Sequence, residues 1–195
     1  MNYLAHSFLS RPTPHSIVGN LMGDFRKHIS PVHDLPGAVI RGIENHMQVD
    51  RFTDNDPRVI ELKKLFSKRR RRFAGIIIDV TFDYFLLKHW NLYSKQEPQL
   101  FIQGVYKHLR EQRYLMPEEM VRVTSLMAVN DWFSSYATLQ GIGCVLDRMS
   151  ARIRFENNLS GSVEEVLSHY QSLEKGFLDF FPRLNEHISR SRIES

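Results

Sequence analysis

The sequence predicts an all-α protein made of a single domain. Apolar residues recur at helical spacing along nearly the whole chain, and runs that alternate like strands are almost absent. The chain has 195 residues, of which 42% are hydrophobic and 25% charged, as is ordinary for one globular domain. No internal repeat or low-complexity linker divides it. We therefore expect one helical bundle over residues 1–195.

Proline and glycine residues separate the expected helices. Pro12 and Pro14 follow the first helix, Gly19 and Gly23 interrupt the second, and two prolines make residues 29–37 a loop. The expected helices cover residues 2–10, 16–28, 37–53, 57–68, 71–90, 98–113, 117–140, 142–155 and 162–189.

Three prolines bear on the ends and the continuity of these helices. Pro57 and Pro117 suit the first turn of a helix, where no partner is needed for the missing N–H. Asp54 and Asp56, just before Pro57, are expected to act as turn or capping residues. Pro182 is expected to kink or split the last helix.

Cysteine content and hydropathy exclude several classes of protein. The single cysteine, Cys144, excludes an internal disulfide framework, and we expect it to be buried as a small hydrophobe. The N-terminal sequence lacks the basic region of a signal peptide, and no stretch approaches the ~20 apolar residues that a membrane helix needs. A cytoplasmic protein with no membrane segment is expected.

The net charge is +4, and its excess is concentrated in one short run. Such a run favours an acidic partner, although it is also typical of a solvated helix face. Its members are Lys63, Lys64, Lys68, Arg69, Arg70, Arg71 and Arg72.

Ionisable side chains lie on the apolar faces of two expected helices. His46 and Asp50 are one turn apart in the helix at 37–53, and Asp79 and Asp83 are one turn apart in the apolar sequence AGIIIDVTFDYFLL. A buried carboxylate is costly unless it is paired or bound to metal, and two of them four residues apart also repel each other. A divalent cation removes both costs.

Two further candidates precede these helices. His6 lies on a short apolar helix, and Asp24 lies in GNLMGDF, where small residues permit close approach of the backbone. Taken singly, His6 is also compatible with a core histidine, and either aspartate of the 71–90 helix with an arginine partner. Together the six residues predict a shared metal site. The sequence has no phosphate-binding glycine loop, nucleophile elbow or cysteine zinc pattern.

Four stretches in the first half of the chain contain these six residues. They are MNYLAH, GNLMGDF, GIENHMQVDRFTD and DVTFDYFLLKHW, and FFPRL follows at 180–184 in the second half. In these stretches the sequence resembles the acyl carrier protein phosphodiesterase family. The resemblance implies an all-helical fold distantly similar to HD-domain phosphohydrolases. It also implies hydrolysis of holo-acyl carrier protein to the apo form and 4′-phosphopantetheine.

The resemblance also implies a cofactor, a partner and roles for residues. Manganese is the implied cofactor, with magnesium as the alternative. Tyr84 stands where an HD dyad would place histidine, and His89 is a lesser candidate for the site. The implied ligands are Asp24, His46, Asp50, Asp79 and Asp83, and the implied catalytic residues are His6, Asp24 and His46. The basic run is expected to bind the acidic carrier protein.

Two other functions fit parts of the sequence. An HD-type phosphohydrolase acting on a nucleotide or other small phosphoester has the same metal site but needs no basic docking face. A helical module binding nucleic acid uses the basic run but has no use for a pair of buried aspartates.

Overall fold

The structure, a computed structural model, describes residues 1–29 and 34–194. These residues form eleven α-helices, four short 3-10 helices and no strand, which confirms the all-α prediction. A cluster of buried hydrophobic side chains drawn from helices along the whole chain forms the core, so the described residues make a single domain. Part of the loop expected at 29–37, namely residues 30–33, lies outside the described residues.

The helices of the first half of the chain surround the site described below. They are α1 (Tyr3–Phe8), α2 (Pro14–Met22), η1 (Gly23–His28), α3 (Gly37–Asn55), α4 (Pro57–Lys63), η2 (Arg71–Phe73) and α5 (Ala74–Lys88). The helices of the second half complete the bundle. They are η3 (Trp90–Leu92), α6 (Pro98–Glu111), η4 (Arg113–Leu115), α7 (Glu118–Val129), α8 (Trp132–Ser135), α9 (Leu139–Arg152), α10 (Val163–Ser168) and α11 (Tyr170–Ser191).

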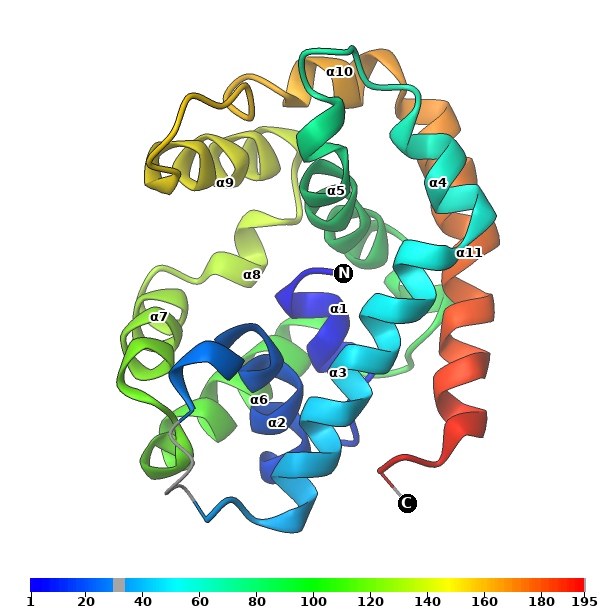
Figure 1. The fold of residues 1–195 in the computed structure, drawn as a ribbon. Helices are drawn as coiled ribbons and strands as arrows, with labels where there is room; N and C mark the ends of the chain where they lie inside the picture. The colour runs from blue at the N-terminus through cyan, green and yellow to red at the C-terminus, as the bar shows by residue number, and fades with distance from the viewer. Residues whose placement is uncertain (30–33, 195) are drawn as a thin grey trace.

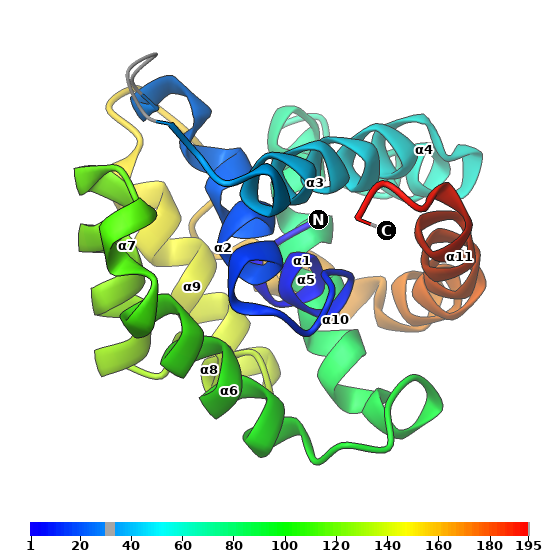
Figure 2. The same cartoon turned by 90° about the horizontal axis from the view of Figure 1, so that it is seen from below.

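Helix α1 lies at the centre of the bundle in both ribbon views (Figure 1, Figure 2). It contacts α2 on one side and α5 on another, and α3 packs along α2. Helix α11 closes one side by contacting α3, α4 and α5, while α9 packs against α5. The short N-terminal helix is therefore enclosed by helices from both halves of the chain.

Helix α5 supplies the core beneath α1. Its side chains Ile77, Ile78, Phe82 and Phe85 are fully buried, as expected for a helix that is apolar almost all round. From α11, Phe177 packs edge-on against Phe82 with ring centroids 5.4 Å apart. These contacts fix the rotation of α5 and so fix where its two aspartates point.

Two glycines allow α2 and α3 to touch along their backbones. A Cβ atom on Gly19 would lie 2.9 Å from the Cα atom of Gly42, closer than side chains tolerate. Only hydrogen at both positions permits this crossing. The close approach places the end of α2 and all of η1 against the middle of α3, where His46 is located.

Some expected boundaries differ from those observed. The helix expected at 117–140 is broken before α8, because Asp131 adopts a left-handed backbone conformation with φ of 44°. The helix expected at 162–189 is interrupted at His169 instead, and α11 continues through Pro182 without splitting. The prediction for Cys144 was wrong, because this side chain is exposed.

The predicted cap at the start of α4 is confirmed. Pro57 occupies the first turn, and the side chain of Asp56 accepts hydrogen bonds from Arg58 N at 2.8 Å and Val59 N at 3.3 Å. Asp56 also pairs with Arg183 of α11. These contacts satisfy helix-terminal amides that would otherwise lack partners.

Candidate functional site

Helix α1 is fixed by a carboxylate from α5. The two oxygens of Asp83 accept hydrogen bonds from the backbone amides of Leu4, at 3.0 Å, and Ala5, at 2.9 Å. Both amides belong to the first turn of α1, where no helical carbonyl is available to them. Asp83 thus anchors the segment that carries the N-terminal amino group and His6.

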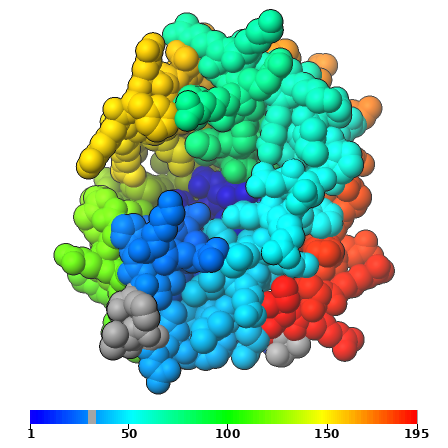
Figure 3. All heavy atoms as spheres, in the orientation of Figure 1, coloured from blue at the N-terminus to red at the C-terminus, as the bar shows by residue number. Residues whose placement is uncertain are grey.

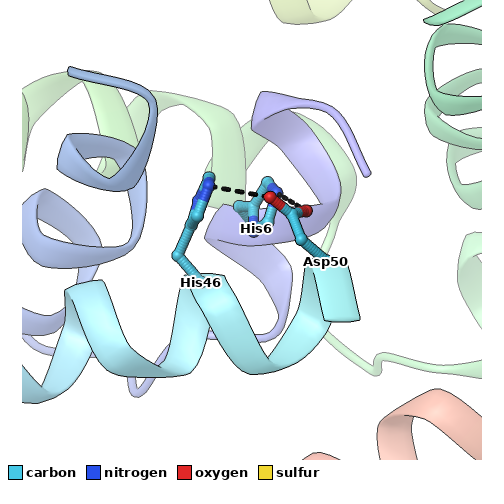
Figure 4. A group of neighbouring side chains, drawn as sticks. All are labelled: His6, His46 and Asp50. Atoms are coloured by element: carbon cyan, nitrogen blue, oxygen red, sulfur yellow. Dashed lines mark ion pairs between the residues drawn. The ribbon is translucent and has the colours of Figure 1, made fainter. Parts of the chain in front are cut away.

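Three side chains from α1 and α3 converge beside this anchor (Figure 4). His6 Nε2 lies 3.2 Å from Asp50 Oδ1, and His46 Nε2 lies 3.1 Å from Asp50 Oδ2. One nitrogen from each ring and one Asp50 oxygen all lie within 4.8 Å of one another. The structure therefore brings together three of the six residues predicted from the sequence as one compact set of donors.

The orientation of His46 is fixed by neighbours on both faces of its ring. Its Nδ1 lies 2.7 Å from the carbonyl oxygen of Asn20, and because a carbonyl only accepts, Nδ1 carries the proton. The ring stacks on His6 with centroids 3.8 Å apart. Gly23 covers the ring, since a Cβ at that position would overlap its carbons. The other ring nitrogen, Nε2, consequently faces Asp50.

Two more of the predicted aspartates border the cluster. Asp24 Oδ1, on η1, lies 3.7 Å from His46 Nε2. Asp79 Oδ1, on α5, lies 3.2 Å from the α-amino group of Met1, which is itself 3.3 Å from Asp50 Oδ1. The positively charged amino group thus occupies the space between two carboxylates.

The cluster is buried on its histidine side and open on its carboxylate side. The side chains of His6 and His46 are 1% and 4% exposed, whereas those of Asp24, Asp50 and Asp79 are 45%, 39% and 30% exposed. Figure 3 shows the N-terminal segment on the floor of a hollow between α3, the segment before α5 and the end of α9. Solvent and small molecules reach the carboxylates from this hollow.

Electrostatics hold His6 and Asp50 in the protonation states that a metal ion requires. Burial lowers the pKa of His6 to about 3, so its ring is neutral near neutral pH. Burial acts to raise the pKa of Asp50, but the hydrogen bonds from His46 and His6 outweigh it and hold that pKa well below its usual range. Neutral imidazole and ionised carboxylate are the ligand forms of these groups.

The amino group of Met1 shows that this cluster stabilises a cation. Burial alone lowers the pKa of an amine. Here the carboxylates of Asp79 and Asp50 outweigh that effect and raise the pKa to about 10.

Asp83 is the predicted ligand that the structure places differently. Its side chain is fully buried, and the two backbone amides of α1 occupy both of its oxygens. Burial raises its pKa to about 7, although those two hydrogen bonds act in the opposite direction. Its place is at the N-terminus of α1 and outside the group formed by His6, His46 and Asp50.

Tyr84 of α5 and His89, which follows the end of α5, belong to another set of contacts. His89 Nε2 lies 2.7 Å from Glu174 Oε1, and the Tyr84 hydroxyl lies 3.1 Å from that of Tyr170. Both partners are on α11. These residues tie two helices together and are not part of the cluster around Asp50.

The basic run divides into structural and exposed members. Arg70 pairs with Glu165 at 3.1 Å and donates to the carbonyl oxygens of Asn158 and Ser160, so it joins two loops. Lys63 and Lys64 pair with Asp54 at 2.9 Å and Glu61 at 2.6 Å, while Arg69 donates to the Asn158 side chain. The remaining members, Lys68, Arg71 and Arg72, are also exposed.

Sequence reasoning missed three contributors to the site. Asn20 orients His46 through its backbone carbonyl, and the side chain of Asn20 accepts a hydrogen bond from Asn45 at 2.9 Å. The amino group of Met1 is a backbone group, so no pattern of residue types in the sequence could predict its contribution. The contact between Gly23 and His46 could have been predicted, because the glycine next to Asp24 already indicated close approach of the backbone at this point.

Comparison with known sequences places the chain in a family. The sequence model of the family described as acyl carrier protein phosphodiesterase matches residues 1–184. The chain belongs to this family. Its phosphodiesterase relatives are named as hydrolases of phosphodiesters, and an open cluster of carboxylates and imidazoles is compatible with that chemistry.

Three relatives named acyl carrier protein phosphodiesterase illustrate the similarity. The protein from Serratia proteamaculans is 35% identical, over 99% of this chain and all of its own length. That from Pectobacterium atrosepticum is 34% identical, over 94% of this chain and 95% of its own. That from Escherichia coli is 32% identical, over 99% of this chain and all of its own.

Neither a solved relative nor, in the part of the chain that the structure describes, a membrane-spanning helix was found. No solved structure matches the chain significantly, so the similarity to the HD-domain fold stays a prediction. Among the helices of residues 1–29 and 34–194, none combines the length and apolar character needed to cross a lipid bilayer.

Proposed function

We propose that this protein hydrolyses the phosphodiester bond between 4′-phosphopantetheine and a serine of holo-acyl carrier protein, with a divalent cation bound by the cluster. The products are apo-acyl carrier protein and 4′-phosphopantetheine. The observation that carries the proposal is the convergence of His6, His46 and Asp50 in a chain of the acyl carrier protein phosphodiesterase family.

The donor set fits a divalent metal ion such as manganese, with magnesium as the alternative. Two imidazole nitrogens and a carboxylate oxygen are ligands common to such ions, and manganese accepts this mixture more readily than magnesium does. His46 Nε2 lies 3.1 Å from Asp50 Oδ2 while the Asn20 carbonyl holds its Nδ1, so this nitrogen and this carboxylate would be available to hold a cation. Asp24 and Asp79 at the rim supply two further carboxylates for the same ion.

The residues around the proposed ion have different roles in the proposed hydrolysis. A divalent cation there supplies positive charge that stabilises the phosphate oxygens and acidifies the attacking water. Asp24 is exposed and 3.7 Å from His46, so it is reachable by that water and suited to accept its proton. Asn20 holds His46 in one tautomer, which keeps the ring fixed while charge develops.

The exposed members of the basic run are suited to the acidic surface of an acyl carrier protein. Lys68, Arg71 and Arg72 lie on the segment that borders the hollow in Figure 3, next to the start of α5. Opposite charges across an interface steer association and set orientation more than they add affinity. This role is assigned to these three residues, since Arg70 already has protein partners.

A charge-reversal experiment tests the docking role. Lys68→Glu, Arg71→Glu and Arg72→Glu together are expected to raise KM for holo-acyl carrier protein about tenfold at low salt, with a smaller difference at high salt. Lys107→Glu with Arg110→Glu, on α6, is the matched control. An unchanged KM in the triple variant contradicts the docking role.

The reaction is tested by mass spectrometry of holo-acyl carrier protein incubated with the enzyme and Mn²⁺. We expect the mass of the carrier protein to fall by that of the prosthetic group, with no change after chelation by EDTA. Nucleotides and single-stranded nucleic acid are included as competing substrates and ligands. Phosphate release from nucleotides with an intact holo-carrier protein would replace this proposal with the HD-type phosphohydrolase.

A further inference from the structure

A second basic stretch lies beside the basic run in the folded protein, although the two are far apart in the sequence. It contains Arg152, at the end of α9, and Arg154 just after it. The ring of Phe155 stacks on that of Phe73 with centroids 6.4 Å apart, and the guanidinium carbon of Arg72 lies 5.2 Å from the Phe155 centroid. The fold therefore joins the two stretches into one basic face, which borders the hollow in Figure 3.

The loop that follows α9 is held in place by hydrogen bonds on both sides. The side chain of Asn157 donates to the carbonyl oxygen of Ser150 at 3.1 Å and accepts from the hydroxyl of Ser150 at 2.6 Å. The next residue, Asn158, accepts from the Arg69 side chain at 2.6 Å and, through its carbonyl oxygen, from the Arg70 side chain at 3.0 Å. Because the loop is already ordered, a partner that docks there loses little binding energy to ordering it.

Phe155 is the exposed aromatic group of the basic face. Its side chain is 53% exposed, whereas Phe73, on which it stacks, is buried. Arg71, Arg72 and Arg154 are also exposed, and none of the three has an acidic partner among residues 1–29 and 34–194. Aromatic residues and arginine are enriched in protein interfaces, where a few such residues carry most of the binding energy. The basic face therefore has the composition of a protein interface.

The chemistry of the basic face suits an acidic protein better than a nucleic acid. Arginines without acidic partners complement acidic side chains, and one exposed ring offers an apolar contact to an aliphatic side chain among them. A single-stranded nucleic acid needs several aromatic rings on which successive bases stack. In residues 63–73 and 152–160 the only exposed aromatic ring is that of Phe155.

We propose that Phe155, together with Arg72 and Arg154, is the anchor that an acyl carrier protein contacts when it docks beside the hollow. This inference rests on the proposed function, because it assigns a contact to the same partner. It extends the docking surface from the basic run to the loop after α9. The ring supplies the apolar contact at the centre of the interface, and the arginines orient the acidic partner around it.

Binding of apo-acyl carrier protein tests the anchor without turnover, because the apo form has no prosthetic group to release. Phe155→Ala is expected to raise Kd at least about tenfold, as truncation of an aromatic anchor does. Tyr114→Ala, which removes a ring that is 73% exposed on η4, is the matched control and should leave Kd unchanged. Fluorescence anisotropy of a labelled carrier protein measures both Kd values.

A charge reversal outside the basic run serves as a second variant, because loss of the Phe155 ring could also disturb the loop. Arg154→Glu is expected to raise Kd about fivefold at low salt and less at high salt. Arg110→Glu, at an exposed position of α6, is its control. With holo-acyl carrier protein, Phe155→Ala and Arg154→Glu should raise KM and leave kcat within about twofold, because neither residue belongs to the cluster.

Two results overturn the anchor. Unchanged Kd for apo-acyl carrier protein in folded Phe155→Ala and Arg154→Glu contradicts the contact, while removal of the prosthetic group by wild type would leave the proposed function intact. Loss of oligonucleotide binding in these variants, with unchanged binding of the carrier protein, makes a nucleic acid the partner of this face. If wild type binds the apo form through these residues but does not shorten the holo form, the proposed function fails and the anchor stands.

Discussion

Two helices of this protein each carry a pair of ionisable residues one turn apart, yet the pairs end in different places. On α3, His46 and Asp50 both point into the cluster. On α5, Asp79 borders the cluster, while Asp83 binds the backbone of α1. The two pairs have the same spacing in the sequence. They differ in the groups of the folded protein that lie next to each residue.

The difference teaches what a buried carboxylate indicates. Asp83 is fully buried and Asp79 is 30% exposed, so the more buried member is the one without a place in the cluster. Two helix-terminal amides satisfy both oxygens of Asp83 without a cation. Burial of a carboxylate therefore predicts a partner but does not say whether that partner is a metal ion or a helix N-terminus.

The largest expected effect is loss of the carboxylate that contacts both histidines of the cluster. Asp50→Asn is expected to lower kcat on the order of 1000-fold, because Asp50 faces both histidines and the proposed metal position. Asp54→Asn, one turn further along α3 and 72% exposed, is the matched control and should retain activity. Steady-state kinetics and titration calorimetry with Mn²⁺ measure both variants. Equal activity and metal affinity in the two variants contradicts the site.

The two aspartates of α5 should differ in how much each contributes to the stability of the fold. Asp83→Ala leaves two buried amides without partners and is expected to lower the free energy of unfolding by about 2–3 kcal/mol. Asp79→Ala should lower it by less than about 1 kcal/mol, because that side chain is partly exposed, while activity falls. Denaturant unfolding measures the stability of both variants. Equal destabilisation would contradict the different roles assigned to Asp79 and Asp83.

Displacing the His46 ring is expected to lower activity less than replacing Asp50. Gly23→Ala places a methyl group against the His46 ring, so the ring must turn and activity is expected to fall roughly 10- to 100-fold. The backbone at Gly23 is helical, so alanine itself is tolerated there. Gly104→Ala, on α6 with open space around it, is the control and should be fully active. A fully active Gly23→Ala variant means that the ring position is not critical.

The pH dependence of stability provides a further test of the buried position of Asp83 beneath α1. Its pKa is raised to about 7 in the folded protein, above that of the unfolded chain. Between about pH 4 and pH 7 the folded state therefore holds a proton that the unfolded state has lost, so stability falls as pH rises. One such proton contributes a slope of at most about 1.4 kcal/mol per pH unit. Asp83→Asn should remove this slope, and an unchanged slope assigns it to other groups.

Local patterns in the sequence predicted the fold class and the residues that the structure brings together in the candidate site. Helical periodicity and proline placement identify the helices, and the spacing of His46 and Asp50 on one helix is enough to place both on one face. The breaks before α8 and at His169 escaped prediction. The first depends on a left-handed conformation at Asp131, which many aspartates do not adopt.

Other features of the site depend on tertiary contacts between backbone groups. The carbonyl of Asn20 and the amides of Leu4 and Ala5 exist at every position, so no residue type signals their use. The separation of Asp79 from Asp83 follows from where α1 enters the bundle, which the local sequence of α5 does not encode.

The anchoring of α1 by Asp83 affects how mutants of this protein are interpreted. A helix of six residues is too short to persist alone, so His6 keeps its position only while the carboxylate beneath it holds the first turn. Replacing Asp83 is therefore expected to displace His6, a proposed ligand, although Asp83 itself takes no part in the proposed reaction. A screen that scores only turnover would class this residue with the ligands, whereas a parallel melting curve would reveal it as scaffolding.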